Sequence, residues 1–126
     1  MEKLIEALKG IEVSLAKTRG PFNLFGLFLR MQDLDRWDLV ASSAWLKENH
    51  REDIGLISQS LQDKLSPDQL LMISGIVILN PQEPFVKMIN GIINCEHGFV
   101  DFENNTINGI TIAHAYLITS QNLSAE

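Results

Sequence analysis

Residues Pro21 to Leu46, PFNLFGLFLRMQDLDRWDLVASSAWL, decide how this chain folds. Two apolar runs, which hold both tryptophans of the protein, Trp37 and Trp45, flank the polar break 32–36. Apolar and aromatic segments on either side of a short polar turn are typical of a β-hairpin. Because aromatic side chains bury large apolar surfaces, we expect this hairpin to anchor the hydrophobic core.

The first run of the hairpin, residues 22–31, fits two interpretations. A helix would place Leu24, Leu27 and Phe28 on one face, whereas a strand would alternate them between two faces. We favour the strand because Gly26 weakens a helix and the run is rich in aromatic residues. A strand with two apolar faces belongs in the middle of a sheet. One face then carries Phe25, Leu27, Leu29 and Met31, the other carries Phe22, Leu24 and Phe28, and the returning strand 37–42 places Trp37, Leu39 and Ala41 together.

The remaining elements follow from hydrophobic period and from helix start signals. Residues 1–19 predict an amphipathic helix with an apolar stripe that includes Leu4, Leu8 and Leu15 and polar faces that include Glu12. Gly20 and Pro21 end this helix. Further helix starts are expected at Asn49, at Ser66 with Pro67, and at Asn80 with Pro81, the last of these opening a helix with the apolar face Phe85, Met88, Ile89 and Ile92. Residues 73–79 predict a strand buried on both faces, and residues 99–103 and 110–119 predict a second hairpin around the loop 104–109.

These elements indicate an α+β fold. We expect a single mixed or antiparallel sheet of about five strands, made of two hairpins plus one strand, with helices packed mainly on one face. The 126 residues suit a single α+β domain spanning residues 1–126. Its N-terminal amphipathic helix covers residues 1–19, and residues 121–126 are expected to form a flexible tail.

The charge is unevenly distributed along the chain. Residues 1–31 carry five Lys/Arg and three Asp/Glu, whereas residues 32–126 carry five Lys/Arg and thirteen Asp/Glu. Nucleic-acid binding demands clustered basic residues, so the acidic part of the chain argues against it. No apolar run reaches the roughly 18–20 residues that span a bilayer. With no secretory signal pattern and Cys95 as its single cysteine, we expect a cytoplasmic protein without membrane contact.

The polar tip of the first hairpin is the first candidate site. Asp33 and Asp35 are spaced as at the start of a calcium loop, but Asp38 stands where that loop needs glycine and Ala44 where it needs glutamate. No metal ligand is therefore assigned. We predict instead that the tip and its tryptophans form an edge that meets a partner, comprising Arg30, Asp33, Asp35, Arg36, Trp37 and Trp45.

The last strand supplies the second candidate site. Strand alternation places His114 and Tyr116 on one face with Ile110, Ile112 and Ile118, where they could line a ligand pocket together with Asp101. Cys95-Glu96-His97 contains zinc-type ligands, but a zinc site needs at least three of them together. No phosphate-binding loop or nucleophile motif occurs, so we assign no catalytic residue and no cofactor.

Two classes of function remain. The surplus of apolar faces favours a non-enzymatic interaction or oligomerisation domain, either a homodimer or a protein with a different protein partner. The alternative is a small-molecule-binding domain or a small metal-dependent hydrolase that uses His114 and nearby carboxylates. The lack of a nucleophile, base and oxyanion constellation favours the first class.

Overall fold

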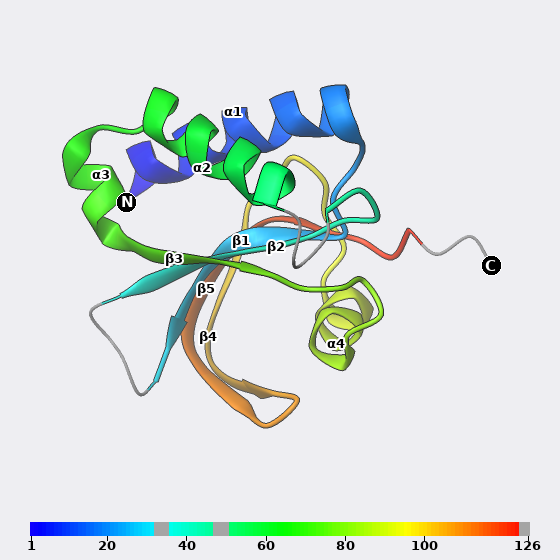
Figure 1. Cartoon of the computed structure of the whole chain (residues 1–126). Coiled ribbons are helices and arrows are strands. Elements are labelled where there is room, and N and C mark those ends of the chain that lie inside the picture. Colours follow the sequence, from blue (N-terminus) through cyan, green and yellow to red (C-terminus); the bar gives the residue numbers. More distant parts are fainter. Residues whose placement is uncertain (32–35, 47–50, 124–126) are drawn as a thin grey trace.

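The computed structural model describes residues 1–31, 36–46 and 51–123, and within them it contains four helices and one five-stranded sheet (Figure 1). The predicted α+β class is therefore confirmed. In chain order the elements are α1 (Glu2–Arg19), β1 (Leu24–Arg30), β2 (Trp37–Ser42), α2 (Arg51–Lys64), α3 (Pro67–Met72), β3 (Ile73–Ile78), α4 (Pro84–Ile92), β4 (Val100–Ile107) and β5 (Ile110–Ser120). None of the described helices combines the length and the apolar character needed to cross a membrane.

The sheet has the strand order β3-β2-β1-β5-β4, so β1 lies at its centre as predicted. Strands β2 and β3 pair in parallel, and the other neighbours are antiparallel. The strand interpretation of residues 22–31 is confirmed. Gly26 suits this strand for a second reason: a Cβ atom there would lie 2.5 Å from the Tyr116 carbonyl oxygen of β5. The central strand can therefore approach β5 closely only with glycine at this position.

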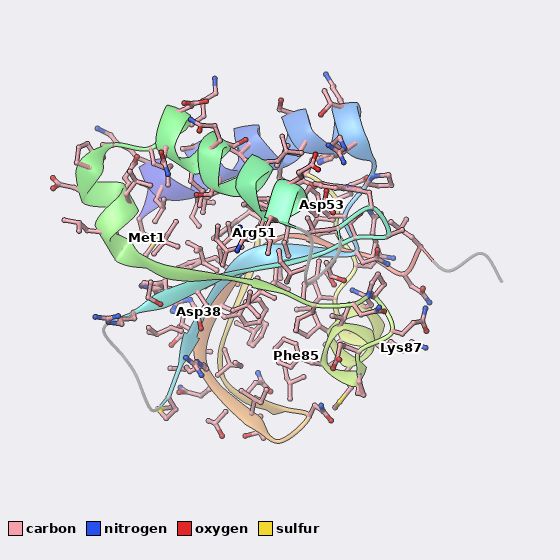
Figure 2. The ribbon with its side chains drawn as sticks, in the orientation of Figure 1. Met1, Asp38, Arg51, Asp53, Phe85 and Lys87 are labelled. Atoms are coloured by element: carbon pink, nitrogen blue, oxygen red, sulfur yellow. The ribbon has the colours of Figure 1, made fainter. Side chains whose placement is uncertain are left out.

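Each face of the sheet carries its own hydrophobic cluster. Helices α1 and α2 cover the face that we call the α1 face, while α4 packs against the opposite α4 face (Figure 1). Figure 2 shows Phe85 of α4 in the space next to the sheet, and its ring lies 5.6 Å from that of Phe28. The α1-face cluster includes Phe25, Leu27, Leu39 and Ala41, and the α4-face cluster includes Leu24, Phe28, Val40, Val86 and Ile89.

Phe22 is a correction to the predicted faces. It belongs to the α1-face cluster, with its ring 4.9 Å from that of Phe25, rather than to the face of Leu24. The reason is that β1 begins only at Leu24, so strand alternation does not extend back to Phe22.

The predicted ends of α1 and the predicted start of α3 are confirmed, whereas the start expected at Asn80 with Pro81 is wrong. Residues 80–83 form a turn closed by hydrogen bonds to Asn80, and α4 begins only at Pro84. The α1 stripe is buried as expected, and Gly20 ends the helix with a φ of 135°, which favours glycine. Ser66 and Gln69 form the capping box that opens α3. The predicted start at Asn49 lies outside the described residues. In α4, however, Val86 is buried while Met88 and Ile92 are exposed, so the predicted apolar face was partly wrong because this short helix contacts the sheet along a narrower arc.

Two strand predictions need correction. Residues 73–79 were expected to be buried on both faces, but β3 is an edge strand with Val77 exposed, because an apolar run does not reveal how many neighbours a strand has. The loop 104–109 is shorter than expected. Strand β4 continues to Ile107, and the turn consists of Asn108 and Gly109, whose positive φ angles of 50° and 81° match a two-residue hairpin turn.

Candidate binding site on the open part of the sheet

The α1 and α2 helices leave part of the α1 face open, over β5, β4 and the start of β2. Two irregularities in the pairing of β5 with β1 decide which side chains point there. His114, Tyr116 and Ile118 share the α1 face as predicted, whereas Ile112 packs in the α4-face cluster. The predicted grouping of Ile112 with His114 was wrong because a register shift lies between them.

Four side chains on this open area form what we call the aromatic row: Phe99, Tyr116, His114 and Trp37. Tyr116 is its centre, with ring centroids 4.4 Å from His114 and 5.6 Å from Phe99, both stacked. Trp37 lies 5.3 Å from Tyr116 and 6.0 Å from His114. Strand pairing explains the contact, because Leu29 of β1 pairs with both Trp37 and His114 and so places β2 and β5 on either side of it. Phe99, at the outer end of the row, is 50% exposed.

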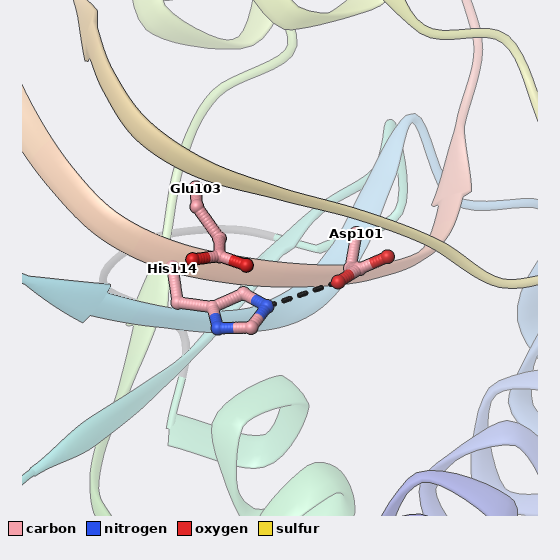
Figure 3. A group of neighbouring side chains, drawn as sticks. All are labelled: Asp101, Glu103 and His114. Atoms are coloured by element: carbon pink, nitrogen blue, oxygen red, sulfur yellow. Dashed lines mark hydrogen bonds and ion pairs between the residues drawn. The ribbon is translucent and has the colours of Figure 1, made fainter.

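Two carboxylates stand beside this row. In the register of the β4–β5 hairpin, Asp101 pairs with Tyr116 and Glu103 with His114. The Asp101 Oδ2 atom lies 3.1 Å from His114 Nε2 (Figure 3), and one ligand atom from each of Asp101, Glu103 and His114 lies within 4.8 Å of the other two. Both carboxylates are exposed, and His114 is partly buried. The site therefore offers an imidazole nitrogen and two accessible carboxylates on a firm sheet surface.

The pKa of the Tyr116 phenol reflects the electrostatics of the site. Partial burial, and then the negative charges of Asp101 and Glu103, raise the pKa of Tyr116 above its ordinary value. A negative potential that disfavours a phenolate favours a bound cation at the same place. The arrangement is thus chemically suited to hold positive charge.

The other predicted interaction residues that the structure describes are not gathered here. Arg30 pairs with Asp38 at 3.3 Å, and strand alternation places Asp38 on the face opposite Trp37. Arg36 is exposed, while Asp33 and Asp35 lie outside the described residues. Among the residues of the predicted edge that the structure describes, Trp37 alone lies on the open area.

Trp37 is the first residue of β2, and Trp45 lies beyond the opposite end of that strand. Its ring packs edge-on against Phe22 at 5.6 Å, and its Nε1 donates a hydrogen bond to the Gly20 carbonyl at 2.9 Å. The Arg19 guanidinium sits 5.1 Å from its ring centre. Trp45 thus fastens the end of α1 to the β2 end of the sheet, and the two tryptophans do not form one edge.

A second carboxylate–imidazole pair exists, and sequence analysis missed it. Glu12 is fully buried, its Oε1 contacts His97 Nδ1, and its Oε2 accepts a hydrogen bond from the Thr119 hydroxyl at 2.8 Å. The prediction that Glu12 lies on a polar face of its helix was wrong. Its partner His97 is 85 residues away, so no local pattern could have signalled the pair. The Cys95 thiol nearby is partly buried, and its pKa is raised mainly by that burial.

A shallow hollow of about 1070 Å³ lies at the other end of the sheet. Its lining includes segments that follow the carboxyl ends of the parallel strands β2 and β3, with Arg19 and Glu83 as its charged residues among those described. None of the described residues that line it is a histidine or a cysteine, the side chains that titrate near neutral pH or bind transition metals. The open area around Tyr116 is the stronger candidate site.

Comparisons with protein-family models, with curated proteins and with solved structures find no match. The chemistry of the open area therefore has to be inferred from its own groups. These are two accessible carboxylates, one imidazole and a row of stacked rings, groups whose chemistry suits the binding of a cation.

Proposed function

We propose that this protein is a non-enzymatic binding module whose protein partner presents arginine side chains to the aromatic row. The observation that carries this proposal is the placement of Asp101 and Glu103 directly beside Tyr116 and His114. A guanidinium can donate paired hydrogen bonds to a carboxylate while its flat face stacks on a ring, and the open area offers both partners.

The stacking geometry favours arginine over methylated lysine. A cage for a quaternary ammonium needs rings that surround an empty space. Here Phe99 and His114 both stack on Tyr116, so the rings pack against one another and do not surround an empty space. The exposed ring of Phe99 extends the row outwards, and a guanidinium can join the row there while reaching Asp101.

The test measures the binding of a short tetra-arginine peptide by calorimetry and by tryptophan fluorescence. Asp101→Asn with Glu103→Gln should weaken binding about tenfold or more, since charge-assisted hydrogen bonds contribute roughly 1.5–3 kcal/mol each. The matched control is Asp68→Asn with Glu6→Gln, which removes the same charge from exposed positions on α3 and α1. Equal weakening by both double variants would show attraction to net charge alone and would overturn the proposal.

A second candidate function is binding of a divalent transition metal. The specific observation is that ligand atoms of Asp101, Glu103 and His114 lie within 4.8 Å of one another. Imidazole with carboxylates suits zinc, iron or manganese, and three protein ligands are what a metal-dependent hydrolase typically uses. His114→Gln should abolish Zn²⁺ or Mn²⁺ binding in calorimetry. If tetra-arginine binding survives in that variant, the two functions are separable.

The homodimer and the cytoplasmic location stay predictions. The exposed side chains of Met88 and Ile92 on α4 give a homodimer an apolar surface to cover. Light scattering at high micromolar concentration measures the oligomeric state, and a strict monomer there would contradict the homodimer.

A further inference from the structure

Strand β4 forms one edge of the sheet, and its two sides differ in chemistry. Asp101 and Glu103 lie on the α1 face, while Phe102 packs in the α4-face cluster. We propose that β4 accepts an extended segment of the partner as a sixth strand, in which basic residues alternate with apolar ones. This inference rests on the proposed function, because it assigns the conformation and the residue pattern of the same arginine-bearing partner.

The edge of β4 is available for strand pairing. Within the described sheet, β4 pairs with β5 alone, so its outer backbone groups have no strand partner. Natural edge strands are commonly protected by charged side chains, proline or bulges. The β4 sequence VDFENNTI contains no proline, and its two charges, Asp101 and Glu103, are both negative, so they repel acidic strands and attract basic ones. Asn104 takes a positive φ of 51°, which ends the straight part of the strand. The pairing stretch is therefore short and centres on residues 100–103.

The α1 side of this edge specifies basic residues. Asp101 and Glu103 are two positions apart, so both side chains point to one face of the strand. A neighbouring strand presents its own alternate residues to that face, and opposite charges in such cross-strand positions stabilise pairing. Two arginines separated by one residue would therefore meet the two carboxylates.

The α4 side specifies the residue between those arginines. Ile92 of α4 is 71% exposed, and with Phe102 and Asn105 it lines an apolar crevice of about 80 Å³ between helix and hairpin. A strand added to β4 would point its middle side chain to this side. An apolar side chain there would cover Ile92, which water now surrounds.

Charge excludes a second copy of β4 as the added strand. Antiparallel pairing of two β4 edges would bring Asp101 and Glu103 of both copies together, and like charges across strands destabilise a sheet. After Lys64 the chain carries a single basic residue, Lys87 on α4, so its C-terminal half offers no basic strand. The occupant is therefore a different protein.

Four peptides, each with three arginines and two valines, test this inference by calorimetry with the intact protein. The first is Arg-Val-Arg-Val-Arg and the second is Arg-Arg-Arg-Val-Val. The third and fourth are the first peptide with N-methyl groups on alternate amides, along one edge of the strand in the third and along the other edge in the fourth. The alternating peptide should bind about tenfold more tightly than the block peptide, because the block peptide cannot place its arginines in register with the two carboxylates. It should also bind about tenfold more tightly than the peptide that is methylated along the edge facing β4, because that peptide loses several backbone hydrogen bonds. Ile92→Ser, an exposed change that leaves the core intact, should weaken only the alternating peptide, by about threefold to tenfold.

The outcomes separate the two levels of the proposal. If all peptides bind equally and Asp101→Asn with Glu103→Gln weakens them all, strand addition is overturned while arginine binding stands. If that double variant weakens none of them beyond the Asp68→Asn, Glu6→Gln control, both are overturned. A dimer that the alternating peptide dissociates would assign the edge to a second copy and overturn the inference.

Discussion

The Glu12–His97 and Asp101–His114 pairs differ mainly in their access to solvent. Glu12 is fully buried, and its two oxygens are taken by His97 and Thr119. The Asp101 side chain is 46% exposed, contacts His114 through one oxygen, and has Glu103 beside it. The first pair joins α1, the segment before β4 and the end of β5, whereas the second lies within one hairpin.

This contrast shows that contact between a carboxylate and a histidine does not by itself form a binding site. A buried carboxylate whose lone pairs are satisfied stabilises the fold, because removing its partners would leave polar groups without hydrogen bonds. An exposed carboxylate contributes little to stability, and its unused lone pairs can accept a ligand. The two pairs should therefore separate cleanly into a stability effect and a binding effect.

Glu12→Ala should give the largest effect. It leaves the Thr119 hydroxyl buried without its acceptor and removes the buried carboxylate that contacts His97 Nδ1, so the free energy of unfolding should fall by about 2–4 kcal/mol. Urea unfolding measures the change, with Glu6→Ala on the exposed side of the same helix as control. Equal effects of the two substitutions would remove the structural role assigned to the buried pair.

Asp101→Asn with Glu103→Gln should lower peptide affinity but leave the free energy of unfolding nearly unchanged. Because both side chains are exposed, we expect the free energy of unfolding to change by less than about 0.5 kcal/mol. The same urea experiment checks this, alongside the peptide affinities that the double variant should lower. A large loss of stability would mean that the open site, like Glu12, is part of the structural framework.

The pKa of Tyr116 should report the field of the open site. Tyr116 is the sole tyrosine of the chain, so absorbance of the tyrosinate follows this site alone. Removing the charges of Asp101 and Glu103 should lower its pKa towards that of a partly buried phenol, and the Asp68→Asn, Glu6→Gln control should leave it in place. An unchanged titration in the first variant would contradict the electrostatic origin of the shift.

The same shift has a consequence for stability at alkaline pH. The folded phenol keeps its proton above the ordinary pKa of 10.0, whereas the unfolded phenol loses it. The contribution to the free energy of unfolding is therefore complete below pH 10 and is lost as the pH rises through the folded pKa. Urea titrations between pH 9 and 11 should show this decline, and Tyr116→Phe should make it shallower.

Cys95 should show the smallest effect, a slow reaction with thiol reagents. Burial raises its pKa, with the Ser120 backbone hydrogen bond opposing and the charge of Glu12 adding to the rise. Less thiolate is therefore present at pH 8 than in the unfolded chain, and thiolate is the reacting form. The reaction rate with a disulfide reagent, measured with and without urea, checks this; equal rates would contradict it.

Local patterns predicted much of this architecture. The two apolar faces of residues 22–31 indicated a central strand, and Ser66 with Gln69 marked a helix start, because each signal is contained in a few neighbouring residues. Alternation along β5 also placed His114 beside Tyr116, and the register of the hairpin then added Asp101.

The features that escaped prediction depend on the sheet as a whole. Trp37 contacts Tyr116 because their strands, β2 and β5, are both neighbours of β1 in the sheet. No local sequence pattern predicts this strand order. Likewise, the register shifts of β5 and the partner of Glu12 depend on residues far apart in the chain. The sequence therefore predicted some residues of the site but not how the sheet brings them together.

The position of β1 has a consequence for the synthesis of the protein. Its first neighbour, β2, follows at once, but its second neighbour, β5, leaves the ribosome only after α2, α3, β3, α4 and β4. Until then β1 is an apolar strand with one unpaired edge, which is the kind of segment that aggregates during folding. We therefore expect the nascent chain to depend on chaperone protection until residues 110–120 emerge, and chains that terminate before β5 to be insoluble.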